Sequence, residues 1–188
     1  MASVLVSGAP LQAARLSDAL RGQGAEITQV TDLEYMPGVC ADAGADAFDA
    51  YVQLSSSFQM WGETAVERVH HFYAGGVLAR FTAMRSAVST LRTGARVIFV
   101  LGRLPAEVAS QDDRDARESL TKVLIKAARA DATAQLSTRI LDSDTTVDDI
   151  VAAALGSDSE SQQLLAELSD LDYADWRVEV LGLAALDT

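Results

Sequence analysis

The chain has a single cysteine, Cys40, and two histidines among its 188 residues. One cysteine cannot form an internal disulfide, and without two or three Cys or His residues nearby it cannot build a thiolate zinc site. The histidines, His70 and His71, are adjacent, so on a helix their side chains point about 100° apart and cannot chelate one metal together. The composition therefore favours neither a disulfide scaffold nor a metal centre.

Long apolar runs and positive charge are also scarce. No stretch reaches the eighteen apolar residues that a membrane span needs, and the first residues lack the basic segment of a signal peptide. Lys plus Arg total 15 against 27 Asp plus Glu, and the net charge of −12 makes nucleic acid and anionic membranes poor partners. We expect a soluble, cytoplasmic protein, and the length favours one domain spanning residues 1–188.

What the chain does contain is an alternation of strand-like and helix-like segments. Five short runs rich in β-branched and aliphatic residues predict strands at 3–7, 26–31, 50–55, 96–101 and 137–141, with a sixth candidate at 177–183. Helical spacing of apolar residues predicts helices over 11–20, 64–91, 116–130 and 147–155, with a short helix around 162–168.

This alternation predicts an α/β fold, a Rossmann-like doubly wound parallel sheet of five or six strands with helices on both faces. The third and fourth strand candidates are almost continuously apolar, as expected of strands that are covered on both faces. Only the segment 32–49 separates the second and third strands, which is too short for a helix, a strand and another helix. The simplest strand order is therefore 2-1-3-4-5.

Three segments carry a resemblance to a known family. Residues 3–32 resemble the opening βαβ unit of a short-chain dehydrogenase/reductase (SDR), residues 72–102 resemble its long helix and following strand, and residues 146–159 resemble the helix and Ser-Asp turn before its last strand. The chain is short between the second and third strands and leaves no room for the family's substrate lid. The resemblance thus implies a degenerate and truncated SDR-like protein.

The family's cofactor motifs are only partly present. Its phosphate loop, T-G-x-x-x-G-x-G, falls on Ser7, Gly8, Gln12 and Ala14, so the second and third glycines are missing. Asp32 stands where the family carries the acid that binds the ribose of NAD. Gly8 and Asp32 are the candidate cofactor-binding residues and are expected to be vestigial, because a tight turn explains Gly8 and Asp is an ordinary turn residue.

The family's catalytic residues are not recognisable. The resemblance places Lys122 at the catalytic lysine, but Glu118 stands four residues earlier, where the family has tyrosine. The pair is typical of a surface ion pair on a helix. The position of the family's asparagine falls on Tyr73. We therefore assign no catalytic residue, and no metal and no cofactor are expected.

The long helix is apolar on more than one face, which indicates a second buried surface. Phe72, Tyr73, Val77 and Phe81 are the candidate interface residues. In the family this helix belongs to the dimer interface, so the resemblance implies a homo-oligomer or a hetero-oligomer with an SDR-type subunit.

These observations lead to three hypotheses about function. The first is a catalytically inactive SDR-like subunit that acts by association, as in heteromeric SDR-type dehydrogenases with a non-catalytic subunit; its partner would be a hydroxyacyl-CoA or ketone/alcohol dehydrogenase. The second is a divergent NAD- or NADP-dependent oxidoreductase, or another nucleotide-binding protein, that uses Gly8 and Asp32. The third is the structural half of a split ketoreductase.

Overall fold

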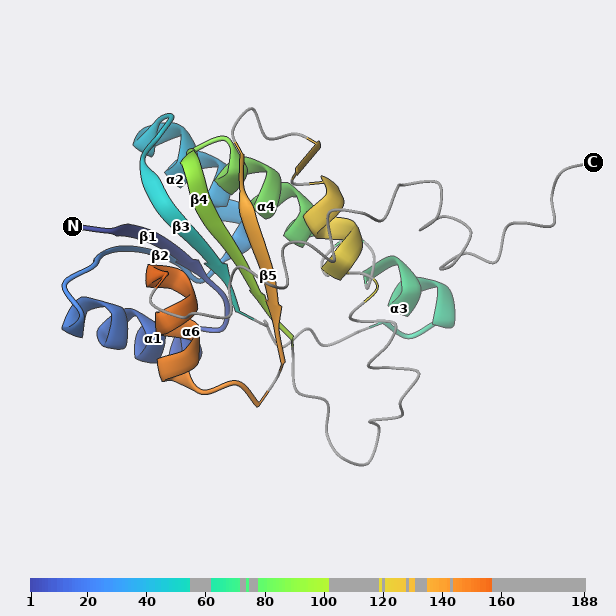
Figure 1. The fold of residues 1–188 in the computed structure, drawn as a ribbon. Helices are drawn as coiled ribbons and strands as arrows, with labels where there is room; N and C mark the ends of the chain where they lie inside the picture. The colour runs from blue at the N-terminus through green and yellow to red at the C-terminus, as the bar shows by residue number, and fades with distance from the viewer. Residues whose placement is uncertain are drawn as a thin grey trace, which may run out of the picture.

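The computed structural model describes residues 1–54, 62–71, 74, 78–101, 119, 121–127, 129–130, 135–142 and 144–156. Its centre is a parallel sheet of five strands in the order β2-β1-β3-β4-β5 (Figure 1). The strands are β1 (Ser3–Ser7), β2 (Glu26–Val30), β3 (Phe48–Gln53), β4 (Leu91–Val100) and β5 (Ser137–Leu141). The predicted α/β class and the predicted strand order are confirmed, whereas the sixth strand candidate lies outside the described residues.

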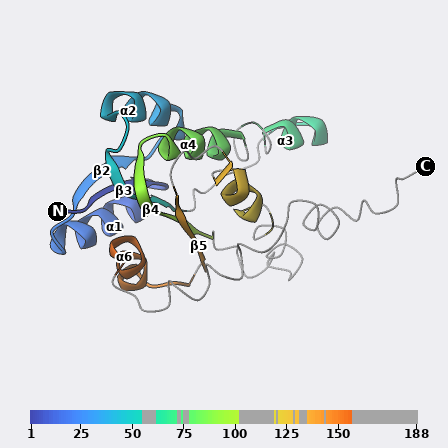
Figure 2. The ribbon, with the colours of Figure 1, turned by 45° about the horizontal axis from the view of Figure 1, so that its top comes forward.

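Helices cover both faces of the sheet (Figure 2). On one face lie α1 (Pro10–Gly22) and α6 (Val147–Leu155), whose buried side chains pack on alternate residues of β1 and β3. The other face is covered by the short η1 (Leu33–Tyr35), α2 (Met36–Ala43), α4 (Ala79–Val88) and the helical residues 121–127. No described helix has the length and apolar character that a membrane crossing requires.

The predicted helix at 64–91 differs from the structure at its end. The described part of this segment forms α3 (Ala65–His71) and α4, and α4 stops at Val88 instead of continuing to residue 91. The Thr90 hydroxyl donates to the Ala87 carbonyl at 2.7 Å, and the Thr90 carbonyl accepts from the backbone N–H of Phe48 at 3.1 Å. The chain therefore enters β4 at Leu91, five residues earlier than the apolar run at 96–101 predicts.

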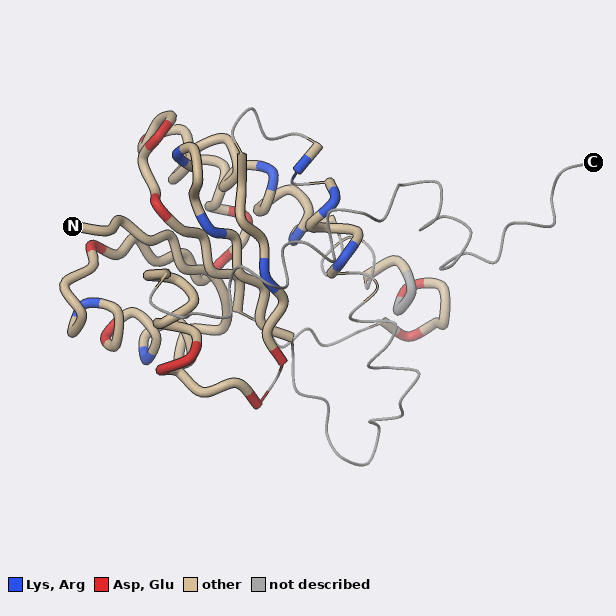
Figure 3. The backbone as a smooth tube through the Cα atoms, viewed as in Figure 1, with Lys and Arg blue, Asp and Glu red and all other residues tan. Residues whose placement is uncertain are grey.

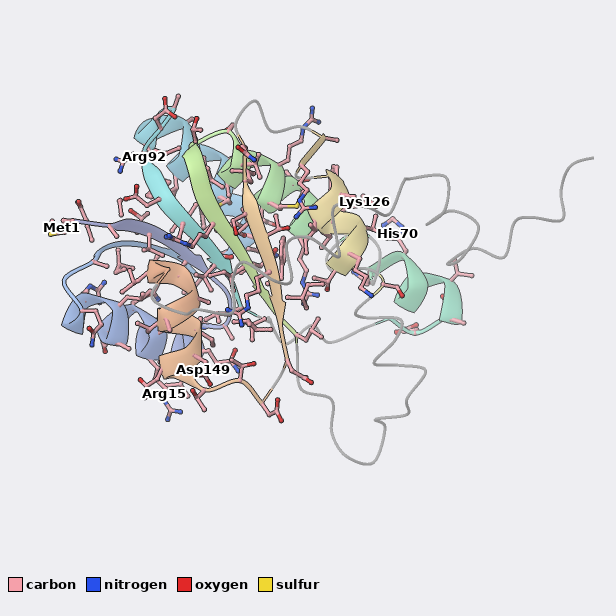
Figure 4. The ribbon with its side chains drawn as sticks, viewed as in Figure 1. Met1, Arg15, His70, Arg92, Lys126 and Asp149 are labelled. Atoms are coloured by element: carbon pink, nitrogen blue, oxygen red, sulfur yellow. The ribbon has the colours of Figure 1, made fainter. Side chains whose placement is uncertain are left out.

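Long-range hydrogen bonds fix the end of the sheet where the strands begin. The Asp49 carboxylate accepts from the Ser3 backbone N–H at 2.7 Å and from Arg92 Nη1 at 2.8 Å, and Arg92 Nε donates to the Asp46 carbonyl at 2.7 Å. Burial opposes ionisation of Asp49, but these donors outweigh it and hold the pKa of the carboxyl below its usual value. Figure 4 shows Arg92 at this end and Asp149 at the opposite end.

Candidate functional site

The carboxyl ends of β1 and β3 form the point where the order of the sheet reverses. From β1 the chain proceeds through α1 to β2 on one side, whereas β3 pairs with the other side of β1. In doubly wound sheets such a switch point is where ligands bind, in the crevice outside the strand ends. The residues that the structure places there are Ser7, Gly8, Gln53 and Leu54, with Asp32 at the end of the neighbouring β2.

Gly8 turns the chain sharply away from β1. Its φ is +142°, and a Cβ at this position would lie 2.5 Å from the Leu54 Cβ and 3.1 Å from the Leu54 carbonyl oxygen. The Leu54 backbone N–H donates to the Ser7 carbonyl at 2.7 Å, which holds the two segments together. Only glycine fits so close to Leu54. The contact between the ends of β1 and β3 therefore explains why the residue in this tight turn is glycine.

The first turn of α1 follows directly. Ala9 is its N-cap, without a side-chain capping bond, and Pro10 occupies the first turn. The first hydrogen bond within the helix joins the Ala13 N–H to the Ala9 carbonyl at 2.9 Å. The backbone N–H groups before Ala13 therefore have no carbonyl partner within the helix. Gln12, at the position of the family's second glycine, is exposed. A residue with a long polar side chain thus stands where the family has its second glycine.

Asp32 is the N-cap of η1. Its Oδ1 accepts a hydrogen bond from the Glu34 backbone N–H at 3.0 Å, and the carboxylate is exposed. This is the turn role expected of an Asp after a strand, and it fixes the start of the crossover to α2. The carboxylate also lies at the end of β2, the place that the resemblance assigns to a ribose-binding acid.

Buried polar groups lie just inside the switch point, on the face covered by α2 and α4. The Ser7 and Tyr51 hydroxyls share a hydrogen bond of 2.9 Å and are fully buried. Burial raises the pKa of Tyr51, and the hydrogen bond with Ser7 offsets this only in part. Gln53 is only 5% exposed, and its Oε1 has no hydrogen-bond partner among the described residues.

The sequence analysis did not predict that Ser7, Tyr51 and Gln53 are buried together. The pattern that could have indicated it is the pair Tyr51 and Gln53, two polar side chains at alternate positions of an otherwise apolar strand. Because alternate residues of a strand share a face, that spacing places both on the same side of the sheet.

Exposed carboxylates lie at the carboxyl ends of the two outer strands, β2 and β5. Asp32 and Glu34 follow β2, and Asp144 and Asp148 lie between β5 and the first turn of α6; all four are exposed. Figure 3 shows acidic positions where β5 ends and α6 begins. Exposed carboxylates at these strand ends disfavour the binding of phosphate groups beside them.

The structure describes the remaining candidate residues only in part. Phe81 is half-buried against the core between the sheet and α4, whereas Phe72, Tyr73 and Val77 lie outside the described residues, so the predicted interface stays a prediction. Lys122 lies in the helical residues 121–127, and Glu118 is outside the described part of the chain.

The described residues contain no group of three or more His, Cys, Asp or Glu side chains that could hold a metal ion. His70 and His71 stack edge to face on α3 with their ring centroids 6.0 Å apart. Cys40 is buried in the core, and burial raises the pKa of its thiol.

No protein-family model matches the sequence, and no curated protein matches it. Solved structures do resemble the fold. The protein lin1944 from Listeria innocua superposes with a TM-score of 0.59 at 10% identity, covering 84% of this chain and 96% of that one. A putative short-chain alcohol dehydrogenase from Burkholderia multivorans gives 0.56 at 10% identity, covering 83% and 88%. BdcA (YjgI) from E. coli gives 0.53 at 13% identity, covering 83% and 91%.

The chain has a Rossmann-like α/β fold. At these identities the likeness concerns the fold alone, because one such fold carries many unrelated activities. The function must therefore be argued from the residues at the switch point.

Proposed function

We propose that this chain is a catalytically inactive SDR-like subunit that acts by association, either with a catalytic SDR-type partner or with a second copy of itself. The observation that carries the proposal is that the two retained cofactor-site residues serve the fold. Gly8 is required by its contact with Leu54, and Asp32 caps η1. Their presence needs no bound nucleotide to explain it.

The residues that differ from the family pattern support the same conclusion. Gln12 and Ala14 stand where two glycines let the backbone approach a pyrophosphate, and both are exposed on α1. The exposed carboxylates of Glu34 and Asp148 add charge repulsion against a phosphate at this edge of the sheet. Steric hindrance and charge thus oppose dinucleotide binding together.

Thermal unfolding with and without millimolar NAD or NADP tests the loss of cofactor binding. A site filled at one hundred times its Kd would stabilise the fold by about 2.7 kcal/mol, which raises Tm by about 5–10 °C in a protein of this size. We expect no shift. A shift of that size, abolished by Asp32→Asn but not by Asp18→Asn on the outer side of α1, would refute the proposal.

Sedimentation and co-purification test the association. We expect either a stable dimer of the purified chain or a complex with an SDR-type dehydrogenase whose activity depends on this chain. A monomer that leaves the activity of co-expressed SDR-type enzymes unchanged would contradict the proposal.

One observation favours a second candidate, a divergent nucleotide-binding protein. Gln53 Oε1 is a buried acceptor at the switch point, and leaving such an atom without a donor costs about 1–3 kcal/mol. A ligand N–H or O–H group would remove that cost. In this case a nucleotide would raise Tm, and Gln53→Leu would abolish the rise while leaving the Tm of the ligand-free protein unchanged or higher.

A further inference from the structure

The strand β2 forms one edge of the sheet (Figure 2), and among the described residues it pairs with β1 alone. All five of its residues stay in one parallel register with β1. An edge strand presents a row of backbone groups that can bind another chain, and natural proteins usually block such edges with Lys, Pro or a bulge. The sequence of β2, EITQV, contains neither Lys nor Pro. The outer side of β2 is therefore a surface that can accept a further strand.

Two residues of β2 direct their backbone groups to this open side. The Glu26 N–H donates to the Ala2 carbonyl at 2.8 Å. Because successive residues of a parallel strand bond alternately to its two sides, Glu26 and every second residue after it bond to β1. The N–H and C=O groups of Ile27 and Gln29 therefore face outward. The Gln29 side chain is engaged with α1, since its Oε1 accepts from Ser17 Oγ at 3.1 Å.

The surroundings of this edge carry no net charge, although the whole chain carries −12. The helix α1 packs on β2, and together the two elements hold Arg15 and Arg21 against Asp18 and Glu26. Asp18 and Arg21 form an ion pair of 3.0 Å on the exposed side of α1. At physiological salt, exposed charges more than about 8 Å apart are largely screened. A second copy can therefore approach this edge without strong repulsion.

We propose that the outer edge of β2 binds the same edge of a second copy of this chain, antiparallel about a two-fold axis at Thr28. This inference rests on the proposed role in association and names one surface and its occupant. It is separate from the expected interface at Phe72, Tyr73, Val77 and Phe81.

This arrangement pairs every outward backbone group of the strand. With Thr28 opposite Thr28 of the second copy, Ile27 lies opposite Gln29 in both halves of the interface. Opposite residues of an antiparallel ladder exchange either both backbone bonds or none. Thr28 bonds to β1 and forms a pair without bonds, so the two pairs of Ile27 with Gln29 supply four hydrogen bonds. A two-fold axis at Ile27 or Gln29 would need residue 25 or 31, which lies outside the strand.

The size of the interface indicates a reversible dimer. Interfaces carry about one hydrogen bond per 100–200 Å², so four bonds correspond to about 400–800 Å². Stable interfaces bury about 1,200–2,000 Å² in total. Ile27 and Thr28 are half-buried, and a neighbouring strand would cover more of both side chains. We therefore expect a dimer with a Kd in the micromolar range.

Cysteine cross-linking locates the axis. In the proposed dimer the two Thr28 Cα atoms lie about 4.5 Å apart, which a disulfide spans, so Thr28→Cys should form a covalent dimer on oxidation. The matched control is Glu26→Cys, two residues away on the same face of β2, whose two copies would lie about 14 Å apart and should yield little dimer on a non-reducing gel. The native Cys40 is buried and does not compete.

Sedimentation equilibrium of edge variants tests the hydrogen bonds. Gln29→Pro removes an outward N–H and no bond to β1, so the strand tolerates it while the dimer loses two of its four bonds. Thr28→Lys places two ammonium groups beside the axis. Each variant should raise Kd at least about tenfold, whereas Thr82→Lys, the same change on the exposed side of α4, should leave it unchanged. Circular dichroism checks that each variant is folded.

Hydrogen exchange of the Ile27 and Gln29 amides provides the last readout. Both amides should exchange more slowly at high than at low chain concentration. Slow exchange at every concentration would mean that the chain covers its own edge, and this result would overturn the inference. A monomer at all concentrations, a dimer insensitive to the edge variants, or equal cross-linking of Thr28→Cys and Glu26→Cys would also overturn it.

These outcomes are distinct from a failure of the proposed function. A dimer or an SDR-type complex that survives the edge variants leaves the proposed association standing on another surface. A rise in Tm with NAD or NADP contradicts the proposed function and leaves the test of the β2 edge unaffected.

Discussion

Replacing Gly8 by alanine should destabilise the protein. The loss should exceed that of a glycine-to-alanine change at a position where the added Cβ has no neighbour within 4 Å. The new Cβ would lie 2.5 Å from the Leu54 Cβ, and the φ of +142° is one that an L side chain rarely adopts. Backbone strain of about 1–3 kcal/mol and overpacking of about 1–3 kcal/mol add to a cost of about 2–6 kcal/mol. A cost in this range is a large part of the stability of an ordinary domain.

Urea unfolding followed by circular dichroism measures this cost. The matched control is Gly38→Ala in α2, where a Cβ meets nothing within 4 Å; it should stabilise the helix by about 1 kcal/mol. Leu54→Gly removes the Cβ that the new methyl group would strike, so Gly8→Ala with Leu54→Gly should show a coupling of at least about 1 kcal/mol. A Gly8→Ala cost below about 0.5 kcal/mol, or no coupling, would refute the close contact.

Three further predictions concern buried or partly buried polar groups. The pKa of Asp49 is lowered in the folded state, so the ionised carboxylate contributes about 1 kcal/mol to the free energy of unfolding at a pH above the unfolded-state pKa. This contribution is lost as the pH falls through the folded-state pKa. In thermal unfolding, Asp49→Asn should therefore be less stable than the native chain at pH 7 but nearly equal to it at pH 2–3. Tyr51→Phe should cost about 1 kcal/mol because it leaves the Ser7 hydroxyl buried without its partner, while Tyr51→Phe with Ser7→Ala should recover much of the loss; additive costs would contradict a direct hydrogen bond. Gln53→Leu should be neutral or stabilising by about 1 kcal/mol in the absence of a ligand, and a loss of more than about 1 kcal/mol in urea unfolding would show that Oε1 has a partner.

Local patterns predicted most of the described architecture. The bounds of β1 and β5 agree with the apolar runs at 3–7 and 137–141, and the short connection at 32–49 correctly predicted that β3 pairs with β1. The start of β4 was missed because residues 92–94 are exposed and carry no apolar signal. They join the strand through a shift of register opposite β3, where Phe48 pairs with Leu91 and Ala50 pairs with Arg96.

The candidate site was predicted less completely. Gly8 and Asp32 were recognised as positions of interest, and both turn interpretations agree with the contacts of Gly8 with Leu54 and of Asp32 with Glu34. The buried pair of Ser7 and Tyr51 joins residues 44 positions apart, which no local pattern can report.

The sequence by itself determined the class of fold, the strand order and the acidic character of the chain, because these depend on periodicity, connection length and composition. Only the tertiary structure decided what Gly8 contacts, that the Ser7 and Tyr51 hydroxyls meet, and which buried side-chain oxygen has no donor among the described residues. These features depend on which strands lie side by side in the sheet. Because β1 pairs with β3, residues 44 positions apart, such as Ser7 and Tyr51, come into contact.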